Sequence, residues 1–171
     1  MEKPSTARIA LKWGLITSII IIIYSVILFI SGQFKNQALT LISYLFLLGG
    51  IIMAMREFKS MNNEFMTFGE GLGLGTLTSA VTGLIGSIFG VIYMNYVDTT
   101  IMQQISDMQR EQFEAKGMSS EQIDQALEMA AKFSSPGMLF VFGLLGYLFI
   151  GFILSLITSA ILKKNKPELE F

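Results

Sequence analysis

Few residues in this chain have the side-chain chemistry of a catalytic site. The acids and bases beside the long apolar runs are Arg56, Glu57, Glu64, Glu70 and Asp98, and they fit no recognisable catalytic motif. The chain has no cysteine and no histidine, which excludes disulfides, thiol chemistry, zinc or haem held by those ligands, and imidazole-based triads. We therefore predict that the protein is not an enzyme and holds no cofactor or metal.

Glu70, the acid nearest the third apolar run, has two interpretations. An acid at the edge of a membrane helix is typical of an ion or substrate site. Thr67 and Glu70 also have the spacing of a capping box, in which hydroxyl and carboxylate bind the free N–H groups of a helix start. The glycines at 69, 71, 73 and 75 are not a phosphate loop, because no strand precedes them and the lysine-serine/threonine ending is absent.

Hydroxyl groups are the main polar side chains inside the apolar runs. Thr78, Ser79 and Thr82 could line a path for a transported species. On glycine-rich helices, however, hydroxyls more often bond to their own helix or to a neighbour. Proton relays and ion paths usually need a buried ionisable residue, and the cores of these runs contain none. A small transporter or channel therefore stays as the alternative to a structural role.

The residues discussed above lie in or beside four long apolar runs of the sequence. The chain of 171 residues is 52% hydrophobic and only 15% charged, against about 25% charged in soluble domains. The first run follows a basic segment but is too long for a signal peptide, which predicts a retained transmembrane helix. The fold class we predict is an all-α membrane protein, a single domain over residues 1–171 that contacts the lipid bilayer and no nucleic acid. The predicted spans are about 13–30, 38–55, 69–94 and 138–162.

Small residues are concentrated in the third run and recur in the fourth. In lipid they allow a neighbouring helix to approach closely, as in GxxxG motifs. We predict that the third run is the central helix of a four-helix bundle and packs against the fourth. The predicted packing residues are Gly71, Gly75, Ser79, Gly83, Gly86, Gly90, Gly151, Ser155 and Ser159.

The only sizeable polar segment, about 98–134, predicts an amphipathic helical hairpin between the third and fourth spans. Lys116 and Gly117 form a helix stop signal, and Ser119 with Gln122 has capping-box spacing. The segment is either a lid over its own bundle or a surface for a partner. The residues that we predict for partner contact are all acidic: Asp107, Glu111, Glu114, Glu121, Asp124 and Glu128.

The distribution of positive charge predicts the orientation. Four spans place both termini on one side of the membrane. That side holds eight basic residues, Lys3, Arg8, Lys12, Arg56, Lys59, Lys163, Lys164 and Lys166, and the other holds four, Lys35, Arg110, Lys116 and Lys132. The positive-inside rule therefore predicts cytoplasmic termini and an extracytoplasmic hairpin.

The order of several segments resembles a known family. These are REFKSMNNEFMTFGEGLGLG, VIYMNYVD, MSSEQIDQALEMAAKF, SSPG and a last span with a lysine-rich tail. Together they are similar to the uncharacterised Bacteroidetes inner-membrane family named domain of unknown function 4199. The resemblance implies four helices, a bacterial inner membrane and no assigned activity. It also associates relatives with envelope glycosyltransferase genes. Many relatives have proline after the acid that closes the third span, where this chain has Thr99 after Asp98.

The sequence thus favours a non-enzymatic accessory or scaffold subunit of an envelope complex. Its expected partners are another envelope membrane protein, such as a lipid-linked glycosyltransferase, or a second copy of the chain.

Overall fold

The computed structural model describes residues 4–165, and Lys3 and Lys166 of the charge argument lie outside them. In this part of the chain the regular structure is helical, apart from one isolated β-bridge. The elements are α1 (Thr6–Ile30), the short 3-10 helix η1 (Gln33–Lys35), α2 (Gln37–Met61), α3 (Phe68–Ile92), the π-helical turn η2 (Tyr93–Val97), α4 (Thr100–Ala115), α5 (Ser120–Lys132) and α6 (Pro136–Leu162).

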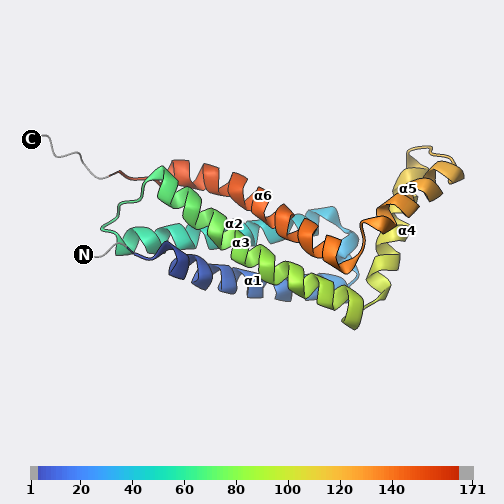
Figure 1. The fold of residues 1–171 in the computed structure, drawn as a ribbon, viewed down its shortest axis with the longest axis horizontal. Helices are drawn as coiled ribbons and strands as arrows, with labels where there is room; N and C mark the ends of the chain where they lie inside the picture. The colour runs from blue at the N-terminus through green and yellow to red at the C-terminus, as the bar shows by residue number, and fades with distance from the viewer. Residues whose placement is uncertain (1–3, 166–171) are drawn as a thin grey trace, which may run out of the picture.

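Four of these helices are long and apolar enough to cross a membrane: α1, α2, α3 with η2, and α6. Figure 1 shows them side by side, with the start of α1, the α2–α3 connection and the end of α6 at one end of the bundle. The α1–α2 connection and the α4–α5 pair lie at the other end. The helix α3 contacts each of the other three long helices, as its small residues predict. The most deeply buried large side chains include Phe58, Leu47 and Leu74.

Side-chain caps begin most of these helices. The Asn36 carboxamide accepts the Ala38 N–H at 3.0 Å at the start of α2. The capping box predicted at Thr67 and Glu70 is confirmed, because the Thr67 N–H donates to Glu70 Oε2 at 2.7 Å and the Glu70 N–H donates to Thr67 Oγ1. Glu70 therefore has a structural role at the start of α3, whatever else it binds.

The connection between α2 and α3 is fastened to the end of α6. The second helix runs past the predicted span to Met61, and the chain then turns through Asn63 and Glu64, both at positive φ. The Met66 N–H donates to the Lys164 carbonyl at 2.9 Å, and the Lys164 N–H donates to the Met66 carbonyl at 2.8 Å. Lys59 Nζ donates to the Leu162 carbonyl at 3.0 Å. These bonds join two segments that are about a hundred residues apart in the chain.

The exit of α3 is a π-helical turn that the sequence did not indicate. The Asp98 N–H donates to the carbonyl of Tyr93, five residues back. The Tyr93 ring stacks on Phe29 of α1 with centroids 4.9 Å apart. Asp98 then accepts hydrogen bonds from the N–H and the hydroxyl of Thr100. The turn redirects the chain from the bundle into α4.

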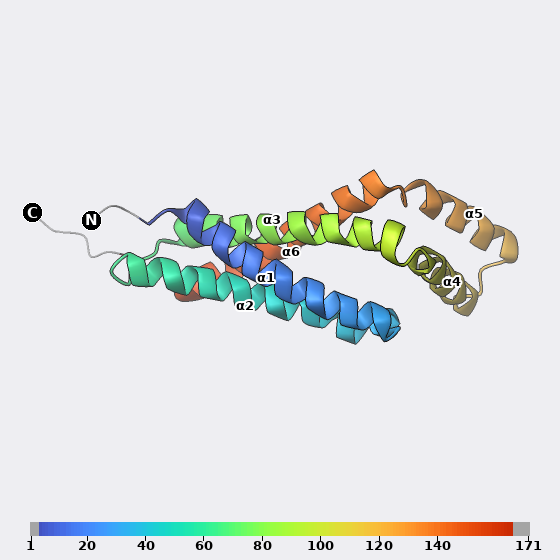
Figure 2. The same cartoon turned by 90° about the horizontal axis from the view of Figure 1, so that it is seen from below.

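The helices α4 and α5, which we call the arm, extend beyond the bundle (Figures 1 and 2). The predicted stop at Gly117 is confirmed, since α4 ends at Ala115 and Gly117 has φ +75°. The predicted capping box of Ser119 and Gln122 at the start of α5 is also present. The two helices contact each other, and the first connects to the bundle through η2.

Candidate functional site

Three features bear on function: the contact between α3 and α6, a polar cluster between α1 and α2, and the arm. The first is a series of close contacts in which a glycine of one helix faces a larger residue of the other, in most cases a serine. A Cβ atom on Gly71 would lie 2.7 Å from Ser159 Oγ, and a Cβ on Gly75 would collide with Ser155. One turn further the roles exchange, because a Cβ on Gly151 would collide with Ser79. Glycine on one helix therefore makes room for serine on the other.

The same register continues toward the arm. A Cβ on Gly83 would lie 2.6 Å from the Tyr147 Cβ, and a Cβ on Gly143 would lie 2.7 Å from Ser87 Oγ. Each step moves four residues forward on α3 and four residues back on α6, so the helices are antiparallel and in contact over five successive turns. We call this contact the α3–α6 seam. Gly143 and Tyr147 belong to it although the sequence analysis did not select them.

Two of the predicted packing residues lie away from the closest contacts. At Gly86 a Cβ would be 3.7 Å from the Tyr147 ring, an ordinary van der Waals distance. At Gly90 it would have nothing within 4 Å. Close approaches occur instead at Gly14, where a Cβ would be 2.6 Å from Val81, and at Gly50, where it would collide with Thr17. These glycines bring α1 against α3 and α2 against α1.

Two of the four seam serines, Ser79 and Ser155, are bonded within their own helices, whereas the buried hydroxyls of Ser87 and Ser159 have no hydrogen-bond partner among the described residues. Ser79 Oγ donates to the Gly75 carbonyl at 2.9 Å, and Ser155 Oγ donates to the Gly151 carbonyl at 2.6 Å. Thr82 donates to the Thr78 carbonyl at 2.9 Å and to the Gly14 carbonyl of α1 at 3.3 Å. Thr78, Ser79 and Thr82 are fully buried. Buried hydroxyls bonded to backbone carbonyls in this way are typical of helix packing in membranes.

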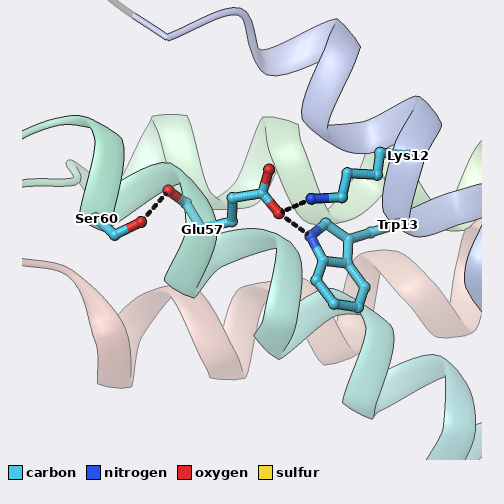
Figure 3. Close-up of polar contacts among 4 residues, drawn as sticks. All are labelled: Lys12, Trp13, Glu57 and Ser60. Atoms are coloured by element: carbon cyan, nitrogen blue, oxygen red, sulfur yellow. Dashed lines mark hydrogen bonds and ion pairs between the residues drawn. The ribbon is translucent and has the colours of Figure 1, made fainter.

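The polar cluster joins the end of α2 to the start of α1 (Figure 3). Glu57 Oε2 accepts hydrogen bonds from Lys12 Nζ and from Trp13 Nε1, each at 2.7 Å. The ammonium of Lys12 also lies 5.5 Å from the centre of the Trp13 ring. Ser60 donates to the Glu57 backbone carbonyl at 2.8 Å. Sequence reasoning named Glu57 as an acid near the membrane but could not find its partners, which lie 44 and 45 residues earlier.

The ionisable residues considered for catalysis do not converge. Glu57 and Glu70 lie at the end of the bundle that holds the α2–α3 connection, whereas Asp98 lies at the arm end. Asp98 and Glu70 both bind backbone N–H groups at helix starts. Among residues 4–165, no group of three or more acids is arranged to hold a metal ion.

The six acids predicted for partner contact are all exposed on the arm. Asp107, Glu111 and Glu114 follow one face of α4, and the other three follow one face of α5, since their spacings are three or four residues. Asp124 pairs with Arg110 at 2.7 Å across the two helices. The other pair, Glu128 with Lys132, is within α5 at 3.5 Å.

The apolar faces of the arm are only partly covered. Ile101 and Ile123 are buried, but Met129 is 61% exposed and Phe133 is 51% exposed. A cleft of about 230 Å³ opens between the two helices, lined by Met102, Gln103, Ile105, Ser106, Gln109, Leu127, Ala130, Ala131 and Ser134. The arm thus presents acids on its outside and, between its helices, an open cleft lined by both polar and apolar side chains.

These features define a multi-pass helical membrane protein with four long apolar helices and a projecting pair of polar helices. The chain belongs to the family described as Protein of unknown function (DUF4199), whose family model matches residues 12–164. This match confirms the resemblance seen in the sequence. Neither the curated proteins nor the solved structures contain a match to this chain.

Proposed function

We propose that the protein is a non-enzymatic accessory or scaffold subunit of a bacterial inner-membrane complex, and that its arm binds a partner outside the cytoplasm. The observation that carries this proposal is the arm itself. It extends beyond the bundle (Figure 2) and exposes an acidic face on each of its two helices. The base of the arm meets the bundle, where Ile105 of α4 lines a pocket with residues of α1 and α2. The far end of the arm projects away from the bundle (Figure 2), which supports a docking surface over a lid alone.

Charge supports the orientation that this proposal needs. At the end of the bundle that holds the start of α1 and the end of α6, the described bases are Arg8, Lys12, Arg56, Lys59, Lys163 and Lys164. At the arm end they are Lys35, Arg110, Lys116 and Lys132. By the positive-inside rule the excess of bases supports cytoplasmic termini and, because the arm is at the opposite end, an extracytoplasmic arm.

The partner expected is a membrane protein with a basic surface near the outer face of the bilayer. Charge complementarity of this kind guides association and selects among partners. The gene association of relatives makes a lipid-linked glycosyltransferase the first candidate, and a second copy of the chain is the other. The small transporter or channel is less well supported, because the hydroxyls that would line its path are fully buried in helix contacts.

The orientation is tested with single cysteines, which give a clean background because the chain has none of its own. A Ser119→Cys variant should react with a membrane-impermeant maleimide in intact spheroplasts. An Asn63→Cys variant, at the opposite end, should react only after the membrane is opened. The reverse pattern would invert the topology and overturn the proposal.

Partner binding is tested by neutralising three unpaired acids together, as Glu111→Gln, Glu114→Gln and Glu121→Gln. The matched control is Glu64→Gln, an exposed acid at the other end of the bundle. Affinity purification from native membranes, with quantitative mass spectrometry, should show partners that are lost from the triple variant and kept by the control. If both variants retain the same proteins as the unmodified chain, the arm is not the docking surface.

A further inference from the structure

A groove on the membrane-facing surface between α1 and α2 is not used by the function proposed above. It has a volume of about 200 Å³ and is almost entirely apolar. Its walls are Trp13, Ile16, Thr17, Ile20, Leu45, Phe46, Gly49, Gly50 and Met53. Because both helices belong to the four candidate spans, this groove faces lipid or another protein rather than water.

Two adjacent glycines create the groove. A Cβ on Gly50 would collide with Thr17, so this glycine allows α2 to pack against α1, and this contact forms the bottom of the groove. A Cβ on Gly49 would meet nothing within 4 Å, so the absence of a side chain at this glycine leaves the groove open. The lining residues Leu45 to Met53 span about 12 Å along α2 at 1.5 Å per residue. That length is close to one leaflet's share of a hydrocarbon core about 30 Å thick.

The mouth of the groove carries positive charge. Trp13 is both a wall of the groove and a hydrogen-bond donor to Glu57, which also binds Lys12. Arg56 is exposed and follows Met53 by three residues and Gly49 by seven, which puts it on the groove face of α2. Arg8 is exposed one turn before Lys12. Among the described residues at this end of the groove, Lys12 and Arg56 therefore outnumber the carboxylate of Glu57, and Arg8 lies one turn further out on α1.

We propose that the groove is a binding site for an anionic phospholipid, with one acyl chain lying along Gly49 and the phosphate near Arg56 and Lys12. The apolar walls match an acyl chain, and the excess of cations matches an anionic headgroup. The Glu57 cluster fixes Trp13 between α1 and α2, so the upper wall of the groove exists before the lipid binds. The apolar walls add an interaction that a small water-soluble anion cannot make, so the site favours an anionic lipid.

Trp13 provides the readout, because it is the one tryptophan of the chain and it lines the groove. The full-length protein is reconstituted into phosphatidylethanolamine vesicles that contain a minor fraction of acyl-brominated phosphatidylglycerol. Parallel vesicles contain the same fraction of acyl-brominated phosphatidylethanolamine. Bromine quenches the indole only at contact distance. We expect stronger quenching by the brominated anionic lipid.

Two pairs of variants distinguish binding of the acyl chain in the groove from binding of the lipid headgroup at its mouth. Gly49→Leu fills the groove and should reduce quenching, whereas Gly73→Leu, on the exposed side of α3 with nothing within 4 Å of its Cβ position, should not. Arg56→Gln should lower the preference for the anionic lipid about fivefold, the effect of one cation near an anionic bilayer surface. Lys35→Gln, at the other end of the bundle, should leave the preference unchanged.

Three results would overturn the proposal. Equal quenching by the two brominated lipids would show that the groove does not select charge. Unchanged quenching in Gly49→Leu would show that lipid does not enter the groove. Oxidative formation of a covalent dimer by a Gly49→Cys variant, in vesicles at low protein density, would show that a second copy of the chain covers this surface.

Discussion

Gly75 of α3 and Ser155 of α6 lie so close that a methyl group on the glycine would collide with the serine side chain. One turn further along the seam the arrangement is reversed, with Ser79 on α3 against Gly151 on α6. The seam thus contains both orientations of one glycine–serine pair. Its tight packing depends on one small partner at each level and not on which helix provides it.

This relationship predicts compensation between the two helices. Gly75→Ser should destabilise the protein by about 1–3 kcal/mol, the usual effect of overpacking a close contact. The double variant Gly75→Ser/Ser155→Gly should recover most of that loss, because the serine is then on α3 as it is at Ser79. Thermal unfolding in detergent, followed by circular dichroism, measures the coupling as a double-mutant cycle.

Gly73→Ser is the matched control for the cycle, since a Cβ at Gly73 would have nothing within 4 Å. It should leave the unfolding midpoint nearly unchanged. Additive effects of the Gly75 and Ser155 substitutions would mean that the two side chains do not share one space.

The Glu57 cluster predicts a second effect on stability. Glu57→Leu removes the acceptor of both Lys12 and Trp13, and it leaves the part-buried Trp13 N–H without a partner, whereas the half-exposed Lys12 ammonium can bind water. We expect a loss of about 1–3 kcal/mol, the range for removing hydrogen bonds to a charged group. Glu57→Gln should lose less, because its amide oxygen can still accept the indole N–H.

The two Glu57 variants should also differ in their response to salt. Added salt screens the partly exposed Lys12–Glu57 pair. Stability of the unmodified protein should therefore fall slightly with ionic strength, whereas that of Glu57→Gln should not. The same salt dependence in both proteins would show that the ion pair contributes nothing measurable.

Local signals in the sequence predicted the ends of elements well, because a cap involves residues only a few positions apart. The capping boxes at Thr67 and Ser119 and the positive φ at Gly117 are of this kind. The residues that face each other across two helices were harder to predict. Gly49 and Gly50 are neighbours, yet one opens a groove and the other closes a helix contact. Only the three-dimensional arrangement of α1 distinguishes them.

The same limit explains what sequence reasoning missed in the candidate site. Periodicity shows that a helix has a small-residue face, but it does not show which turn of that face meets the neighbour. Gly90 was therefore included with Gly75, although only Gly75 lies at a close contact. The Lys12–Glu57 pair and the π-helical turn at Tyr93 depend on where whole helices lie, and a single sequence carries no direct signal for either.

We predict that a substitution at Gly117 destabilises the arm and leaves the bundle unchanged. Gly117 has φ +75°, a conformation that costs about 1–2 kcal/mol for a residue with a Cβ. In Gly117→Ala we expect faster hydrogen exchange in α4 and α5 and unchanged exchange in α3 and α6. Gly137→Ala is the control, because Gly137 is not among the glycines at positive φ and has open space at its Cβ position. Faster exchange throughout the bundle would contradict the separation of arm and bundle.

The bridge between Met66 and Lys164 predicts that the end of α6 stabilises the α2–α3 connection. Proline has no N–H, so Lys164→Pro removes the bond that Lys164 donates to the Met66 carbonyl. The proline should cause little strain in the residue that precedes it, because Lys163 already has φ −56° and ψ 141°, the conformation favoured before proline. We expect faster hydrogen exchange at residues 62–67 and a lower unfolding midpoint. Asn165→Pro, one residue further on, keeps both bridge bonds and should change neither, whereas equal effects of the two prolines would show that the bridge does not stabilise this connection.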